Sequence, residues 1–450
     1  MISCLNILLL FFTVFCQANL IKVPLRRETQ SQNQNFLSGI FNSHLDQNIV
    51  SSYAYNNQTL QHAKLKNNDK QLYTGQILLG QQKKSFTLAI DTSSDKIMIP
   101  SKFCLDQNNC KGFKDSYDCQ ISDGCSVTNS KDTLNYLNGY VSGTYVDALV
   151  CFGDLQNVNQ KILLFDSTNK FQSEYSNGIL GLGVQNNLNE QSNSFVSSLY
   201  KLGLIKENMF SLYLGYKYQD SELILGGYDL KNIVQNARIS NHKLAQVTNQ
   251  NSQKWAINVD KFELNTFKFT YNSTKQVALI DSSFPFIAID QYMYEQLYRF
   301  LLLKGAYLSN NELRIDCKTN IGSMLFYMQD SGQVQREYDL PFSFYTSNST
   351  FDCKILIQPF SSNDNVAFVL GGPFLRRFVS IYSYQNQTIS FAQSTADPQD
   401  DFPVWAIIVI VVVVVIIIIA VIGIYLFKKF KSRRNHGCIH QPFASTTSAY

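Results

Sequence analysis

Ala89-Ile90-Asp91-Thr92-Ser93-Ser94 and Leu279-Ile280-Asp281-Ser282-Ser283-Phe284 are two stretches of the chain built on one pattern. In each, an apolar run typical of a buried strand leads to an aspartate, and a hydroxyl residue and a small residue follow it. The two aspartates lie about 190 residues apart, which is close to the size of a small domain. The repeat therefore predicts two related lobes, each of which brings one aspartate to the interface between them.

Two carboxylates held close together have a characteristic chemistry. Like charges oppose each other's ionisation, so the pair keeps one proton between them. The ionised group can take a proton from a water while the protonated group donates to a carbonyl oxygen. Asp91 or Asp281 alone would be an ordinary turn residue. As a pair they indicate hydrolysis that requires no metal ion and no organic cofactor.

The composition limits the other classes of function. With 450 residues, 45% of them hydrophobic and 16% charged, the chain is long enough to bury two or three cores. Its net charge of +4 is small, and no long basic block occurs outside the C-terminal region. Nucleic-acid binding is therefore not favoured.

The N-terminal region is typical of a secreted chain. An apolar run at residues 5–15 precedes the small residue Ala18, which is the arrangement of a signal peptide. We therefore expect cleavage after residues 1–18. Residues 19–72, rich in Asn and Gln, form a separate leader with basic side chains at Lys22, Arg26 and Arg27.

Residues 404–427 are an almost unbroken run of valine and isoleucine. As a helix at roughly 1.5 Å per residue, this run would be about 36 Å long and would cross a bilayer core of about 30 Å. Asp400 and Asp401 precede it, and five basic residues follow it between positions 428 and 434. The positive-inside rule places residues 428–450 in the cytosol and residues 19–403 in the lumen or outside the cell. We expect a single-pass type I protein of the secretory pathway, in the lysosome or vacuole or at the plasma membrane.

Seven cysteines lie on the lumenal side, where oxidising conditions favour disulfides. Four of them, Cys104, Cys110, Cys119 and Cys125, form a cluster without a histidine at ligand spacing. This favours two short disulfides, with a zinc site as the alternative. Cys317 and Cys353 are expected to pair within the second lobe. Cys151 is then left over, either buried or joined to a partner.

Four sequons also suit a lumenal chain. They begin at Asn57, Asn272, Asn348 and Asn386. Each is a candidate glycosylation site in the secretory pathway.

Between the two membrane signals the sequence is rich in predicted strands. Short apolar or alternating runs are separated by Gly, Asn, Asp and Ser, as in strands joined by turns. The strands predicted in this way are residues 85–90, 223–225, 255–262, 277–280, 355–357 and 366–370. Two helices are expected, at residues 195–202 before Gly203 and at residues 292–303 after Asp290 as N-cap. The predicted class is all-β.

Further motifs occur in a fixed order around the two aspartates. They are residues 73–80, 86–101, 177–183, 198–214, 225–229, 255–257 and 370–378. From Tyr73 to Gln393 this order resembles that of the pepsin-like aspartic proteases. The resemblance implies a bilobal all-β fold with a cleft between two lobes related by a pseudo-twofold axis. It also implies an endopeptidase that acts on peptides or proteins, as a monomer made as a zymogen.

The resemblance assigns roles to individual residues. Asp91 and Asp281 are the expected catalytic pair, and Thr92 and Ser282 are expected to interlock by hydroxyl–backbone hydrogen bonds between the lobes. Ser94 is expected to hydrogen-bond Asp91. Tyr136 stands at the position of the tyrosine on the β-hairpin flap over the cleft.

The chain departs from the family pattern at several positions. Ser93 and Ser283 replace glycines, and their side chains are expected to crowd the aspartates or the substrate. Phe284 replaces a hydroxyl residue beside Asp281, and losing that donor should raise the pKa of the carboxyl. Met98 replaces a tryptophan and Gly372 an acidic residue.

The leading hypothesis is a membrane-anchored aspartic endopeptidase. Its expected segments are lobes at 73–240 and 241–395, a linker at 396–403 and the bilayer helix at 404–427. The start of the leader resembles that of a family propeptide, whose basic residues would neutralise the carboxylate cleft until acidification, and Lys64 or Lys66 would reach the pair. The alternative is an inactive homologue that binds peptides in the same cleft. An adhesion or receptor ectodomain agrees with the topology but leaves the repeated aspartates unexplained.

Overall fold

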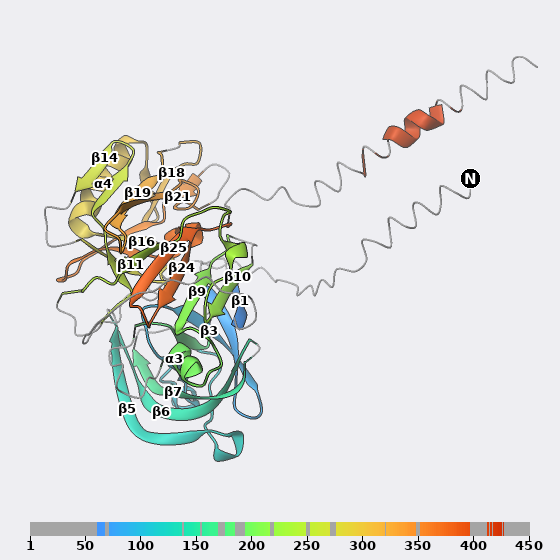
Figure 1. The fold of residues 1–450 in the computed structure, drawn as a ribbon, viewed down its shortest axis with the longest axis vertical. Coiled ribbons are helices and arrows are strands. Elements are labelled where there is room, and N and C mark those ends of the chain that lie inside the picture. The colour runs from blue at the N-terminus through green and yellow to red at the C-terminus, as the bar shows by residue number, and fades with distance from the viewer. Residues whose placement is uncertain are drawn as a thin grey trace, which may run out of the picture. The chain divides into compact units, whose positions relative to one another are not determined.

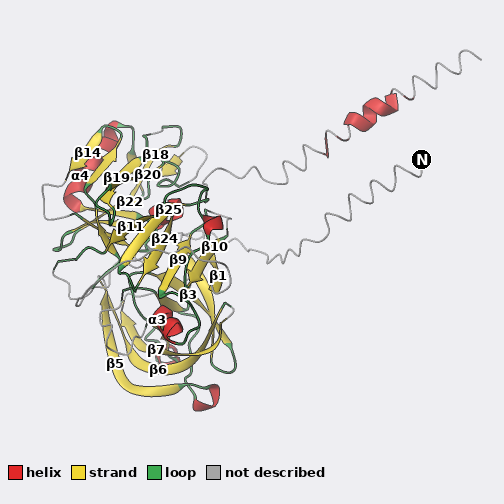
Figure 2. Ribbon diagram, in the orientation of Figure 1, coloured by secondary structure: helices red, strands yellow, loops and turns green. Residues whose placement is uncertain are grey.

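The computed structural model describes eleven segments of the main body and part of the C-terminal region. They are residues 61–67, 72–136, 139–153, 155–169, 176–184, 194–216, 220–248, 253–270, 276–319, 321–347, 352–396, 412–413, 415, 417–424 and 426. Strands predominate in this part of the chain, as Figures 1 and 2 show. The predicted all-β class is therefore confirmed.

The largest sheet has thirteen strands among the described residues. In sheet order they are β11 (Ser240–Lys243), β25 (Thr388–Gln393), β24 (Phe378–Ser383), β9 (Met209–Tyr213), β10 (Ser221–Leu225), β1 (Gln61–Asn67), β2 (Tyr73–Leu79), β3 (Lys84–Asp91), β8 (Gly178–Gly181), β4 (Ile97–Pro100), β7 (Leu155–Asn169), β6 (Gly139–Phe152) and β5 (Ser126–Tyr136). It thus joins most strands of the first half of the chain to the last two.

Three smaller sheets contain the rest of the second half. The five-stranded sheet has the order β12 (Ala256–Asn258), β15 (Val277–Ile280), β23 (Val366–Leu370), β16 (Ile287–Asp290) and β22 (Ile357–Phe360). The four-stranded sheet has β14 (Phe267–Thr270), β13 (Lys261–Leu264), β19 (Met324–Gln329) and β20 (Gln335–Leu340). The three-stranded sheet has β17 (Tyr307–Ser309), β18 (Glu312–Asp316) and β21 (Asp352–Lys354).

Helices are short. They are α2 (Lys102–Asp106), α3 (Phe195–Lys201), α4 (Gln291–Leu303), α5 (Gly372–Arg377) and the 3₁₀ turns η1 (Ile121–Asp123) and η2 (Leu230–Asn232). The Asp290 side chain accepts a hydrogen bond from the Tyr292 N–H, as expected for an N-cap. Gly203 follows α3 with φ +69°, a conformation that favours glycine. Both predicted helices are therefore confirmed.

One arrangement of four strands occurs twice. In the first half, β3 pairs parallel with β8, β8 antiparallel with β4, and β4 parallel with β7. In the second half, β15, β23, β16 and β22 repeat these pairings in the same order and orientation. Asp91 is the last residue of β3, and Asp281 directly follows β15. The repeat in the sequence is thus a repeat in strand pairing.

Two of the predicted strands need correction, while residues 85–90 and 223–225 lie in β3 and β10 as predicted. Residues 277–280 and 366–370 form β15 and β23 as predicted, whereas residues 255–262 divide into β12 and β13. Of the predicted strand 355–357, residues 355 and 356 fall between β21 and β22, because Ile355 forms only an isolated bridge with Thr346. The strand resumes at Ile357.

Strand β1 lies within the region assigned to the leader. It pairs antiparallel with β10 from Gln61 to Leu65 and with β2 at Lys66 and Asn67. It therefore belongs to the largest sheet.

Within the described part of the chain the cysteines form three disulfides, Cys104–Cys110, Cys119–Cys125 and Cys317–Cys353. The four clustered cysteines thus pair with one another rather than serve as zinc ligands. Cys151 is buried and has no disulfide partner among the described residues.

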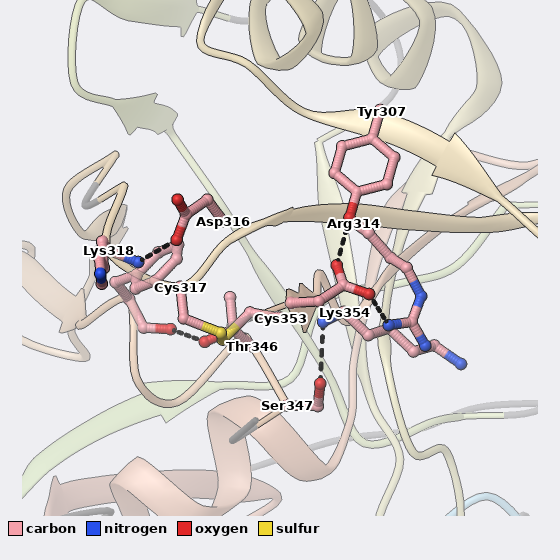
Figure 3. The surroundings of a disulfide bond; sticks show 11 residues. Tyr307, Arg314, Asp316, Cys317, Lys318, Thr346, Ser347, Cys353 and Lys354 are labelled. Atoms are coloured by element: carbon pink, nitrogen blue, oxygen red, sulfur yellow. Dashed lines mark hydrogen bonds and ion pairs between the residues drawn. A yellow bond between two sulfur atoms is a disulfide. The ribbon is translucent and has the colours of Figure 1, made fainter. Parts of the chain in front are cut away.

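The Cys317–Cys353 bridge joins the end of β18 to β21 (Figure 3). Around it, the Tyr307 hydroxyl donates to Asp352 at 2.6 Å, and Arg314 forms an ion pair with the same carboxylate. The bridge closes a longer loop than the Cys104–Cys110 bridge, with a sequence separation of 36 against 6.

Removing the long-loop bridge with Cys317→Ser and Cys353→Ser is expected to lower the free energy of unfolding by about 4 kcal/mol, because cross-linking a longer loop restricts the unfolded chain more. The matched Cys104→Ser and Cys110→Ser variant should lose about 2 kcal/mol. Urea unfolding of the two variants measures the difference. A larger loss for the short loop would contradict this reasoning.

The membrane and glycosylation predictions fall mostly outside the described residues. Of the sequons, only Asn386 lies within them, in the turn between β24 and β25. Residues 1–18 and 428–450 are outside, and residues 404–427 are described only in part. No helix among the described residues is long and apolar enough to span a membrane.

Candidate active site

The two aspartates of the repeat are buried at corresponding positions. Asp91 has no exposed surface and Asp281 is 5% exposed. The Leu182 N–H donates to the Asp91 carbonyl at 2.7 Å, and the Asp281 N–H donates to the Leu370 carbonyl at 3.2 Å. Each aspartate is therefore held by its main chain against the end of the adjacent strand, β8 or β23.

The residues that follow the aspartates connect the two halves of the chain. The Thr92 N–H donates to Ser282 Oγ at 3.1 Å, and the Ser282 N–H donates to Thr92 Oγ1 at 3.0 Å. The two hydroxyls donate in turn to main-chain carbonyls of the opposite half, Thr92 to Ile280 at 2.9 Å and Ser282 to Ile90 at 2.8 Å. Four hydrogen bonds thus fix one aspartate loop relative to the other.

Ser93 and Ser283 contact the carboxyl groups directly. Asp91 Oδ1 accepts from the Ser93 N–H at 2.7 Å and from the Ser93 hydroxyl at 2.6 Å. Asp281 Oδ1 accepts from the Ser283 N–H at 2.9 Å and from the Ser283 hydroxyl at 2.7 Å. The two serine side chains, which were expected to crowd the aspartates, instead donate hydrogen bonds to them.

Ser94 and Phe284 occupy the next position in each loop. Ser94 is buried, and its Oγ accepts a long hydrogen bond of 3.4 Å from the Lys96 N–H. No hydrogen bond from Ser94 to Asp91 is found among the described residues. Phe284 is buried against Phe286, and its carbonyl accepts from the Gly372 N–H at 2.8 Å. Neither residue supplies a donor to the carboxyl of its loop.

The electrostatics of the pair follow from burial and proximity. Burial, and then the charge of Asp91, raise the pKa of Asp281 to about 7. Burial also raises the pKa of Asp91, while hydrogen bonds from Ser93 oppose the rise. The raised pKa of Asp281 was expected, but its main causes are burial and the neighbouring charge rather than the loss of a donor at Phe284. The pair therefore retains a proton well above the pH at which a solvated aspartate ionises.

Lys254 is a charged residue near the pair that sequence reasoning missed. Burial lowers its pKa to about 8, against the opposing charges of Asp95, Asp91 and Asp281. Its own charge lowers the pKa of both catalytic candidates. The available signal was its position directly before the Trp255 motif.

Two aromatic side chains hydrogen-bond to the segment that follows β8. Trp255 Nε1 and the Tyr384 hydroxyl both donate to the Leu182 carbonyl at 2.8 Å. The Trp255 carbonyl accepts from the Ile280 N–H at 2.8 Å. Trp255 thus links the segment after β8, which holds Asp91, to the strand that leads to Asp281.

The two crossing segments, residues 177–183 and 370–378, pass so close to the aspartate loops that neither Gly181 nor Gly371 has room for a side chain. A Cβ on Gly181 would lie 2.4 Å from the Lys96 main chain, and one on Gly371 would lie 2.1 Å from the Phe284 carbonyl oxygen. Both positions therefore require glycine, because any side chain would collide with main-chain atoms.

The remaining predicted site residues lie on other elements. Tyr136 ends β5 and pairs with Gly139 of β6 across a hairpin, and its side chain is outside the described residues. Met98 is fully buried in β4 within an apolar cluster. Gly372 begins α5. The structure therefore brings Asp91, Thr92, Ser282 and Asp281 together and leaves Ser94 beside them.

Comparison with known proteins gives a consistent result. The sequence profile described as Eukaryotic aspartyl protease matches residues 72–394, most of the chain. Plasmepsin VIII of Plasmodium berghei is 26% identical over 340 residues, covering 72% of this chain and 87% of the relative. Candidapepsin-3 of Candida albicans is 27% identical over 346 residues, with 72% and 80% covered. Gastricsin of Oryctolagus cuniculus is 23% identical over 390 residues, with 84% and 96% covered.

Proposed function

Because the chain belongs to the eukaryotic aspartyl protease family, we propose that it is an aspartic endopeptidase in which Asp91 and Asp281 activate a water. The observation that carries the proposal is the pair of buried carboxyls on two loops that hydrogen-bond to each other through Thr92 and Ser282. Fixed orientation and burial are what a proton-sharing pair requires.

The reaction uses the shared proton. We assign the shared proton to Asp281, because burial and the charge of Asp91 raise the pKa of Asp281 to about 7, and Asp91 is then the base. Asp91 takes a proton from the water while the oxygen of the water bonds to the peptide carbon. Asp281 donates its proton to the carbonyl oxygen of the peptide. In the second step Asp91 returns its proton to the leaving nitrogen, the C–N bond breaks, and Asp281 recovers a proton from the intermediate. No covalent enzyme intermediate forms.

An acidic working environment agrees with these pKa values. Below the lower pKa of the pair both carboxyls are protonated and no base remains, and above about pH 7 both ionise and no acid remains. Because folding raises the pKa of Asp281, the stability it contributes is complete in acid and declines as the pH rises toward 7. We propose that the enzyme works in an acidic lumenal compartment. We propose also that the chain is made as a zymogen and is anchored by a single membrane helix at residues 404–427.

The test is hydrolysis of a mixed peptide library by the full-length chain, purified in detergent and acidified to allow leader removal. We expect cleavage that is greatest at acidic pH and that a transition-state-mimic inhibitor of aspartic proteases abolishes. Cleavage that is insensitive to this inhibitor, or no cleavage at any pH from acidic to neutral, would contradict the proposal.

A second candidate function is peptide binding without turnover. Phe284, which places no donor beside Asp281, is the observation that favours it. The same library distinguishes the two functions, because an inactive homologue would retain peptides without cutting them.

A further inference from the structure

Two serines that have the same place in the repeated loops make the same contacts. Ser93 and Ser283 each lie two residues after an aspartate, and each gives Oδ1 of that aspartate a main-chain N–H and a hydroxyl donor. The four donor–acceptor distances lie between 2.6 and 2.9 Å. The arrangement follows the repeat in strand pairing, so it is a paired feature of the site rather than one chance contact.

The two donors of Ser93 bind one oxygen of Asp91 and leave the other oxygen without a donor from this residue. Asp91 Oδ2 is buried and has no hydrogen-bond partner among the described residues. The Ser283 hydroxyl also acts on Asp91, whose pKa it lowers, in addition to bonding Asp281. Ser283 therefore acts on both carboxyls, whereas the bonds of Ser93 go to Asp91.

We propose that Ser93 and Ser283 are positioning residues of the catalytic pair, whose hydroxyls hold the Oδ1 atoms and direct Asp91 Oδ2 toward the reacting water. The proposal rests on the proposed protease function. The hydroxyls supply the side-chain donors that Ser94 and Phe284, one residue further along, do not give to the carboxyls. The serines at the two departures from the family pattern thus support the chemistry.

The physical effect is on charge and on orientation. A hydroxyl that donates to a carboxylate stabilises the ionised form, and its loss costs more than the loss of a neutral hydrogen bond. The main-chain N–H donors of residues 93 and 283 survive replacement by alanine, so the carboxyls keep one donor each. Replacement by alanine therefore removes only the hydrogen bond of the hydroxyl.

The test compares Ser283→Ala with Ser283→Thr, which keeps the hydroxyl, on the full-length chain. We expect Ser283→Ala to lower kcat by about 10- to 100-fold with little change in KM. It should also move the basic limb of the kcat/KM profile to higher pH by about one unit, because the lost hydroxyl is bonded to Asp281. Ser283→Thr should restore the wild-type limb. Ser93→Ala should instead move the acid limb to higher pH, because the Ser93 hydroxyl donates to Asp91. Replacement of the exposed Ser343 by alanine is the control and should leave the profile unchanged.

Calorimetry with a transition-state-mimic inhibitor separates this inference from the proposed function. If the wild-type chain neither cleaves peptides nor binds the inhibitor, the protease function is wrong. If it does, and Ser283→Ala keeps the wild-type pH dependence of cleavage and of inhibitor affinity, the positioning role is wrong. A loss of activity that Ser283→Thr does not recover would also overturn it.

Discussion

Asp281→Asn is expected to lower kcat/KM for peptide hydrolysis by about 10³-fold or more, because the residue transfers a proton in both steps of the reaction. Asparagine has the same shape, and its Oδ1 can still accept from the Ser283 N–H and hydroxyl. The loss is therefore chemical rather than structural. Asp91→Asn should have an effect of similar size, since neither residue can act as both acid and base at once.

Steady-state kinetics on the two variants and on Asp95→Asn provide the measurement. Asp95 is a nearby carboxylate that forms an ion pair with Lys96 at 2.8 Å and donates no proton in the mechanism. Its replacement should change kcat/KM by less than about tenfold, the effect of a nearby charge. Thermal unfolding should show all three variants folded. Activity of Asp281→Asn close to that of the wild type would exclude the catalytic pair proposed for this chain.

The sequence was sufficient for features that local patterns encode. Residues 277–280 and 366–370 form strands because each is a continuous apolar run, and a side chain cap at Asp290 begins α4. The repeated aspartate motif predicted the two related loops because the same residue types recur at the same spacing. Disulfides between cysteines close in sequence follow from the same kind of local information.

Other features depend on contacts between distant parts of the chain. β1 is a polar segment that becomes a strand by pairing with β10 and β2, which its own pattern does not show. α5 begins with Gly372 and Pro373, which are poor helix formers, although proline is tolerated at the first helical position. The sequence also could not show whether the Ser283 hydroxyl would collide with Asp281 or donate to it, because that depends on a side-chain rotamer.

Gly371→Ala is expected to lower the free energy of unfolding by about 3 kcal/mol or more, and to reduce activity with it. The new Cβ would lie 2.1 Å from the Phe284 carbonyl oxygen and 2.5 Å from that of Phe286. Both atoms belong to the main chain, so no side chain can rotate away, and overpacking of this kind costs about 1–3 kcal/mol even where neighbours yield. Gly371 has φ −100°, which any residue can adopt, so the backbone conformation does not require glycine here. The lack of space for a side chain does.

Activity should fall because the displaced atoms belong to the loop that holds Asp281. Phe284 lies three residues after Asp281. Its carbonyl accepts from the Gly372 N–H at 2.8 Å, and its N–H donates to the Asp281 carbonyl at 3.3 Å. Gly332→Ala is the matched control, since a Cβ there meets only a side-chain oxygen of Asp330 at 3.2 Å. Its cost should be within about 1 kcal/mol. Chemical unfolding and kcat on the two variants decide the matter: equal losses of stability, or full activity in Gly371→Ala, would mean that the close crossing does not fix the aspartate loop.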